Sequence, residues 1–154
     1  MNTVPMRAVE SREEALALAS ALDAYAAQAM AEFRDTPLSE GVMRRFFERR
    51  FGEAETLLVV AESRPGAADQ GVCVTGPFED PLTGERVPLI LLLFVSPDRR
   101  HRGVGGALVR EVTRRLAARG LARIAGRAAH NDDALISMGE RWGFVRQWEW
   151  MLRE

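Results

Sequence analysis

The chain has 154 residues, of which 47% are hydrophobic and 28% charged, a composition typical of one soluble globular domain over residues 1–154. Its 21 basic residues, all Arg, nearly balance 22 acidic ones, which disfavours a protein that binds nucleic acid by neutralising phosphates. The single cysteine, Cys73, excludes an internal disulfide framework and fits a reducing compartment.

The first half of the chain predicts a strand, two helices and the start of a β-meander. Ser11 has the form of a helix N-cap, and Glu14 is placed to close a capping box. Gly52 is placed to end the second helix, and the Arg-Pro-Gly sequence at 64–66 predicts a turn. The expected elements are strands over 3–10, 56–61 and 71–75 and helices from 11 to about 33 and over 39–51.

The second half predicts a strand–helix–strand unit followed by a helix and a strand. Residues 87–95 are almost continuously apolar, which predicts a central strand buried on both faces. Leu108, Val112 and Leu116 are spaced four apart, as expected for the buried face of a helix. Asn131 has the form of an N-cap. The remaining expected elements are a helix over 103–119, a strand over 121–126, a helix from 131 to Gly143 and a strand over 144–152.

No segment predicts export or membrane insertion. The N-terminal residues lack a basic region followed by an apolar one, so we expect no signal peptide. The apolar run at 87–95 is far shorter than the roughly 20 residues of a spanning helix. We therefore expect a cytoplasmic protein with no membrane partner. The lack of Lys and the abundance of Ala indicate a GC-rich bacterial genome.

The stretch over 97–108 carries the clearest chemical signal. Its glycines follow a strand and open a helix, where unpaired N–H groups and the helix dipole favour phosphate oxygens. Arg99, Arg100 and Arg102 add full positive charges. A Walker loop is excluded because no Gly-Lys-Ser/Thr follows, and a dinucleotide-binding turn fits less well because Leu108 replaces its third glycine.

The spacing Arg100-x-x-Gly103-x-Gly105 resembles motif A of the GCN5-related N-acetyltransferase (GNAT) family. Downstream, Asn131-x-x-Ala134 followed by Trp142-Gly143-Phe144 resembles the family's motif B. The order of the expected elements also fits the family over nearly the whole chain. The resemblance implies the acyl-CoA N-acyltransferase fold, an α/β protein whose central mixed sheet is splayed after the fourth strand and flanked by helices.

The resemblance also implies acetyl-CoA as cosubstrate and a primary amine as acceptor. Backbone amides of the glycine-rich loop would bind the pyrophosphate, the fourth strand would pair with the pantetheine arm, and Asn131 would reach that arm or position the thioester. The acceptor would be a small-molecule or peptide amine, and a homodimer is one possible assembly because many relatives pair. The implied cofactor-binding residues are Phe94, Val95, Arg100, His101, Arg102, Gly103, Val104, Gly105, Gly106 and Asn131.

The proton-transfer residues depart from the family pattern. Many members carry a Tyr beside the CoA sulfur as general acid, and that position falls on Met138, whose thioether cannot donate a proton. The strand over 87–95 carries no ionisable residue, although some members place a Glu base there. His130 is the best-placed base candidate, although a surface histidine is the simpler interpretation. An acyl-CoA-binding regulatory module without efficient turnover is therefore the alternative function.

Other conspicuous residues favour structural roles. The two histidines and one cysteine form no metal-ligand pattern, so we expect no metal site. We expect Cys73 in the core, Glu79 and Asp80 in a turn, and the arginines of the second helix in solvent. Aromatic residues could line an acceptor pocket but are more typical of core, and the three tryptophans are expected under the sheet. These aromatic residues are Tyr25, Phe33, Phe46, Phe47, Phe51, Trp142, Trp148 and Trp150.

Overall fold

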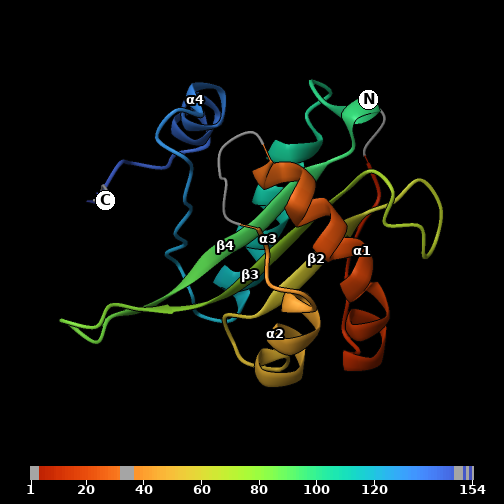
Figure 1. Cartoon of the computed structure of the whole chain (residues 1–154), viewed down its shortest axis with the longest axis horizontal. Helices are drawn as coiled ribbons and strands as arrows, with labels where there is room; N and C mark the ends of the chain where they lie inside the picture. Colours follow the sequence, from red (N-terminus) through yellow and green to blue (C-terminus); the bar gives the residue numbers. More distant parts are fainter. Residues whose placement is uncertain (1–3, 32–36, 148–150, 152, 154) are drawn as a thin grey trace.

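Four antiparallel strands form the sheet of the computed structural model, in the order β1-β2-β3-β4 (Figure 1). The structure describes residues 4–31, 37–147, 151 and 153. The strands are β1 (Met6–Ala8), β2 (Leu57–Ala61), β3 (Gly71–Glu79) and β4 (Arg86–Val95). The helices are α1 (Arg12–Met30), α2 (Val42–Arg50), the 3₁₀ turn η1 (Pro97–Arg99), α3 (Val104–Ala118) and α4 (Asp133–Arg141).

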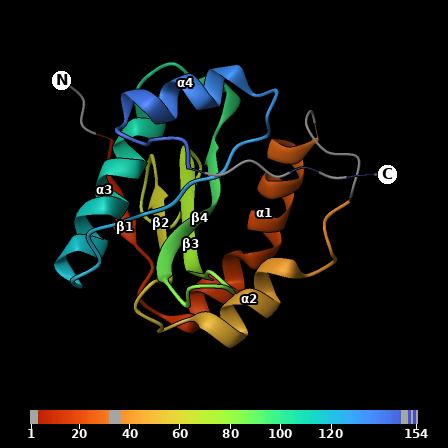
Figure 2. The same cartoon turned by 90° about the vertical axis from the view of Figure 1, so that its left-hand side faces the viewer.

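Helices cover both faces of this sheet, with α1 and α2 on one face and α3 on the other (Figure 2). Apolar side chains of α1 pack against alternate residues of β2, β3 and β4, whose other alternate residues pack against α3. The predicted apolar face of α3 is confirmed, since Leu108, Val112 and Leu116 are all fully buried. Cys73 lies in the same cluster, and burial raises the pKa of its thiol to about 12.

The β4 strand is an edge strand of the four-stranded sheet, not the central strand predicted over 87–95. Antiparallel pairing with β3 covers one edge, and among the described residues the other edge pairs only through an isolated parallel bridge from Leu89 to Ala125. The strand predicted over 121–126 is reduced to this bridge, in which Ala125 accepts from Ile90 and donates to Pro88. Beyond Ile90, β4 therefore has no described strand partner, and this is where the predicted splay begins.

Local turn signals placed most element boundaries within a few residues. The Ser11 hydroxyl accepts from the Glu14 amide at 3.0 Å, as a capping box requires, but the Glu14 carboxylate pairs with Arg7 instead of closing the box. Asn131 is not the N-cap of α4, because Asp132 takes that place and its carboxylate accepts from the Leu135 amide at 3.1 Å. Asp132 is favoured as the N-cap because its carboxylate is negatively charged and lies at the positive end of the helix dipole.

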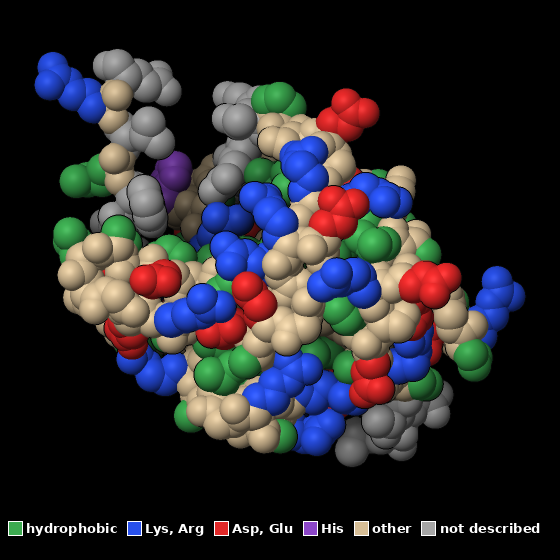
Figure 3. Space-filling model, turned by 90° about the horizontal axis from the view of Figure 1, so that it is seen from below, with side chains coloured by type: hydrophobic (Ala, Val, Ile, Leu, Met, Phe, Trp, Pro, Cys, Tyr) green, Lys and Arg blue, Asp and Glu red, His purple; other side chains and the backbone are tan. Residues whose placement is uncertain are grey.

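The last predicted strand is not formed over residues 144–147 or at Met151, and its other residues, including Trp148 and Trp150, lie outside the described residues. Phe33 also lies outside them, beyond the observed end of α1. The arginines of α2 are exposed, as predicted, and basic and acidic side chains are interspersed over the underside of the molecule (Figure 3).

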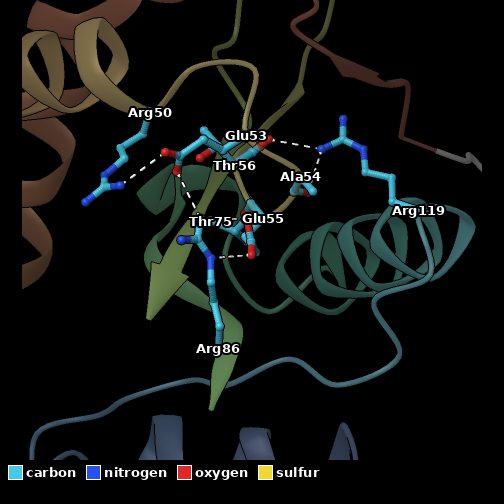
Figure 4. Close-up of polar contacts among 8 residues, drawn as sticks. All are labelled: Arg50, Glu53, Ala54, Glu55, Thr56, Thr75, Arg86 and Arg119. Carbon is cyan, nitrogen blue, oxygen red and sulfur yellow. Dashed lines mark hydrogen bonds and ion pairs between the residues drawn. The ribbon is translucent and has the colours of Figure 1, made fainter. Parts of the chain in front are cut away.

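A polar cluster joins the start of β2 to the β3–β4 hairpin (Figure 4). The buried Glu55 carboxylate accepts from Arg86 Nε and Nη2, at 2.5 and 3.1 Å. This hydrogen bond holds the pKa of Glu55 below its ordinary value although burial acts in the opposite direction. Arg119, just past the end of α3, donates to the carbonyls of Ala54 and Thr56 and so ties that helix to the same loop.

Candidate functional site

The loop between β4 and α3 leads into a helix start whose backbone N–H groups have no helical acceptors. His101 and Gly103 both have left-handed backbone conformations, with φ of 63° and 81°. Gly103 is the N-cap of α3 and provides no side-chain cap. The first i to i−4 hydrogen bond of the helix runs from the Ala107 amide to the Gly103 carbonyl at 3.0 Å. The amides of Val104, Gly105 and Gly106 precede it, so helix geometry leaves them free to donate to a ligand.

Arginine side chains surround this loop. Arg100 donates from Nε to the Val95 carbonyl at 3.2 Å, which fixes the loop against the end of β4. Arg99 lies 3.6 Å from the Asp98 carboxylate, and Arg102 and His101 are exposed. The combination of free amides, the positive end of a helix dipole and nearby guanidinium charges is chemically suited to a pyrophosphate.

The open edge of β4 offers further backbone groups. The Ser96 amide donates to the carbonyl of Gln70, the residue just before β3. By strand alternation, Phe94 and Leu92 therefore also direct their backbone groups toward β3. Leu93 and Val95 then direct theirs to the open side, which agrees with the Arg100 bond to Val95. Of the two residues predicted to pair with pantetheine, Val95 is oriented to do so.

Phe94 does not fit its predicted role, because its backbone faces β3. A β-bulge explains why the backbone of Phe94 faces β3. Leu92 pairs with Val74 and Ile90 with Thr75, so β4 has one extra residue between them. The bulge reverses which residues face outward, and a sequence pattern does not reveal it. The Phe94 ring is buried and stacks on Tyr25 of α1, with ring centroids 4.4 Å apart and an interplanar angle of 5°.

Trp142 packs on the first turn of α3, not under the sheet as predicted. A Cβ atom built on Gly106 would lie 3.0 Å from Trp142 Nε1, and one built on Gly105 would lie 3.6 Å from its Cη2. Trp142 is the C-cap of α4, so this contact brings the C-terminal end of α4 to the start of α3 (Figure 2). The small residues of motif A thus make room for an aromatic ring that sequence reasoning assigned elsewhere.

The remaining predicted residues lie on α4 or just before it. His130 and Asn131 form an exposed turn before the helix, and Met138 is half-buried in its second half. Asn131 precedes α4 and Trp142 follows it, and a helix of nine residues is about 13 Å long. Asn131 and His130 therefore lie at the end of α4 away from the glycine-rich loop.

Two further observations concern only the described part of the chain. It contains no group of three side chains able to hold a metal ion. None of its helices combines the length and apolarity needed to cross a bilayer.

Comparisons with known proteins agree with this geometry. The family model described as "Acetyltransferase (GNAT) family" matches residues 20–144. A comparison with curated proteins found no match. Among solved structures, a predicted acetyltransferase with acetyl-CoA from Clostridium acetobutylicum is similar at 14% identity and a TM-score of 0.73, covering 99% of this chain and 96% of that one.

Two other solved structures have the same fold. AAC(6')-Iy in complex with a bisubstrate analogue is similar at 16% identity and a TM-score of 0.70, covering 99% of this chain and 98% of that one. A ribosomal-protein-alanine N-acetyltransferase from Brucella melitensis biovar Abortus 2308 is similar at 18% identity and a TM-score of 0.63, covering 98% and 99%. Since the family model matches most of the sequence, the chain belongs to the GNAT family of acetyltransferases.

Proposed function

We propose that the protein is an acetyl-CoA-dependent N-acetyltransferase that transfers an acetyl group to a primary amine by direct attack on the thioester. The observation that carries this proposal is the uncapped first turn of α3, entered through left-handed residues at 101 and 103, beside the open edge of β4. The two features together offer donors for a pyrophosphate and a strand edge for an amide-containing arm.

Different residues of the site bind different parts of the cosubstrate. Amides from His101 to Gly106 bind the pyrophosphate, with Arg100 and Arg102 adding charge. Val95 and Leu93 pair with the pantetheine arm through their outward backbone groups. Asn131, at the far end of α4, reaches the arm near the thioester.

The chemistry is acyl transfer with one proton to remove and one to return. The amine nitrogen forms a bond to the acetyl carbonyl carbon, the carbon–sulfur bond breaks, and CoA leaves as thiolate. An outward N–H on β4, that of Leu93, stabilises negative charge on the carbonyl oxygen during attack. His130 or water takes the proton from the attacking amine, and the thiolate gains one from solvent because Met138 cannot supply it. Holding both reactants in one site supplies much of the rate.

The acceptor enters from the side of α1 and α2. One similar structure is a complex with the bisubstrate analogue CoA-S-monomethyl-acetylneamine, and another is a ribosomal-protein-alanine N-acetyltransferase. We therefore include both small-molecule amines and peptide amines in the acceptor panel. We place the activity in the cytoplasm of a bacterium, which fits the buried single thiol and the lysine-free composition.

A second candidate function is acyl-CoA binding without turnover. Met138 and the lack of ionisable residues in 87–95 favour it. Release of free CoA thiol across a panel of primary amines separates the two, because sustained release with any amine removes the binding-only function.

Calorimetric titration with acetyl-CoA tests the cosubstrate site directly. We expect binding by the native protein and its loss in the double variant Arg100→Glu with Gly103→Asp, which places two negative charges at the loop. Arg44→Glu with Glu48→Asp on the exposed α2 face is the control and is expected to bind normally. Absence of binding by the native protein, or unchanged binding by the loop variant, contradicts the proposal. His130→Ala tests the base separately: an unaltered pH–rate profile would dismiss it.

A further inference from the structure

The second turn of α3 carries a cationic side chain that the proposed chemistry does not use. Arg110 is exposed and has no hydrogen bond or ion pair to any other described residue. Its guanidinium folds back toward the first turn, where Nη1 lies 3.4 Å from a Cβ built on Gly106. The indole Nε1 of Trp142 lies 3.0 Å from that same position. Two donor groups from different helices therefore converge on one point beside the glycine-rich loop.

These two donors cannot satisfy each other. An indole N–H and a guanidinium both donate, and neither has an acceptor atom. No acceptor for the indole N–H occurs among the described residues. An anion placed between them would accept from both, and a phosphate matches the planar fork of an arginine particularly well.

The position of Arg110 indicates which phosphate the pair meets. A Cβ on Gly105 would lie 3.6 Å from both Val95, on the strand side, and Trp142, whereas Arg110 is among the nearest neighbours of the Gly106 position alone. If the pantetheine arm follows β4, the adenosine half of the cosubstrate leaves the loop on the opposite side. CoA carries one phosphate beyond its pyrophosphate, on the 3′-oxygen of the ribose.

We infer that Arg110 and the Trp142 indole N–H form a second anion subsite that binds the ribose 3′-phosphate of acetyl-CoA. This inference rests on the proposed function, since it extends the same cosubstrate site. Through this subsite the protein discriminates acetyl-CoA from acetyl-dephospho-CoA, which differs only in lacking that phosphate.

The test is calorimetric titration of the full chain with both compounds. We expect the native protein to bind acetyl-CoA about tenfold more tightly, as befits one exposed charge-assisted contact. Arg110→Gln is expected to reduce this preference to within about twofold, by weakening acetyl-CoA and leaving acetyl-dephospho-CoA unchanged. Trp142→Phe keeps an aromatic side chain, smaller than the indole, and removes the N–H donor, so it is also expected to reduce the preference for acetyl-CoA over acetyl-dephospho-CoA.

Arg114→Gln is the matched control, because it removes the same charge from an exposed position on the same helix, where Arg114 pairs with Glu111. Its preference is expected to equal that of the native protein. Equal native affinity for the two compounds overturns the inference and leaves the proposed function standing. Equal weakening of both by Arg110→Gln also overturns it, because that result assigns Arg110 to the pyrophosphate. Binding of neither compound rejects the inference and the proposed function together.

Discussion

The left-handed conformation of Gly103 makes a sharp prediction for Gly103→Ala. Gly103 has φ of 81° at the entrance to α3, and a Cβ built on it has no neighbour within 4 Å. The substitution is therefore free of steric clash with the rest of the molecule, and its whole effect comes from the backbone. An alanine in this conformation costs about 1–2 kcal/mol, because its Cβ approaches the following carbonyl oxygen.

That strain must appear in one of two measurable places. If the variant keeps the native turn, the free energy of unfolding falls by about 1–2 kcal/mol, a decrease in Tm of about 2–8 °C for a chain of this size. If the free variant relaxes to negative φ, acetyl-CoA must restore the turn, and its Kd rises about tenfold for each 1.4 kcal/mol. The loop is exposed and leads into the start of one helix, so it can relax in the free variant. We therefore expect the increase in the Kd for acetyl-CoA, and not the decrease in Tm, to be the main effect.

Gly66→Ala is the control, because Gly66 also has φ of 81° and an empty surrounding but lies in the β2–β3 turn. It carries the same backbone strain, so its Tm should fall, whereas its affinity for acetyl-CoA should equal that of the native protein. Thermal unfolding gives the Tm of both variants, and calorimetric titration gives their Kd for acetyl-CoA. If Gly103→Ala leaves both Tm and Kd unchanged, the left-handed turn is not required and the account of the loop is wrong.

Three further predictions concern the core, the polar cluster and the proton donor. Leu116→Ala is expected to lower the free energy of unfolding by about 2–5 kcal/mol, since the side chain is fully buried, and a loss below 1 kcal/mol in urea titrations would contradict this. Arg86 keeps the folded pKa of Glu55 below its unfolded value, so the carboxylate stabilises the fold above about pH 4.3 and this contribution is lost as the pH falls through the folded pKa. Glu55→Gln should therefore be less stable than the native protein by about 1 kcal/mol at pH 7, and a difference that persists undiminished at pH 3 would refute the assignment. Met138→Tyr is expected to raise kcat about tenfold with an unchanged KM for acetyl-CoA, and an unchanged kcat would place residue 138 away from the sulfur.

Local signals were sufficient to predict the α/β class, most element boundaries and the glycine-rich loop. The Ser11 cap, the stops at Gly52 and Gly143 and the apolar face of α3 each depend on residues within a few positions of one another. Such interactions form in nearly any tertiary context, and therefore sequence patterns report them reliably. The motif around Gly103 belongs to the same class, because its left-handed backbone is a property of the residue itself.

The sequence alone thus determined the main helices and the first four strands, where the anion-binding loop lies and which family the chain resembles, but not the fate of the strands predicted over 121–126 and 144–152. Only the tertiary structure decided that β4 is an edge strand, that its bulge turns Val95 and not Phe94 outward, and that Trp142 covers Gly106. Each of these outcomes depends on pairing between segments far apart in the chain. A run of apolar residues predicts that a strand will be buried. Long-range packing determines which strands pair with its two edges.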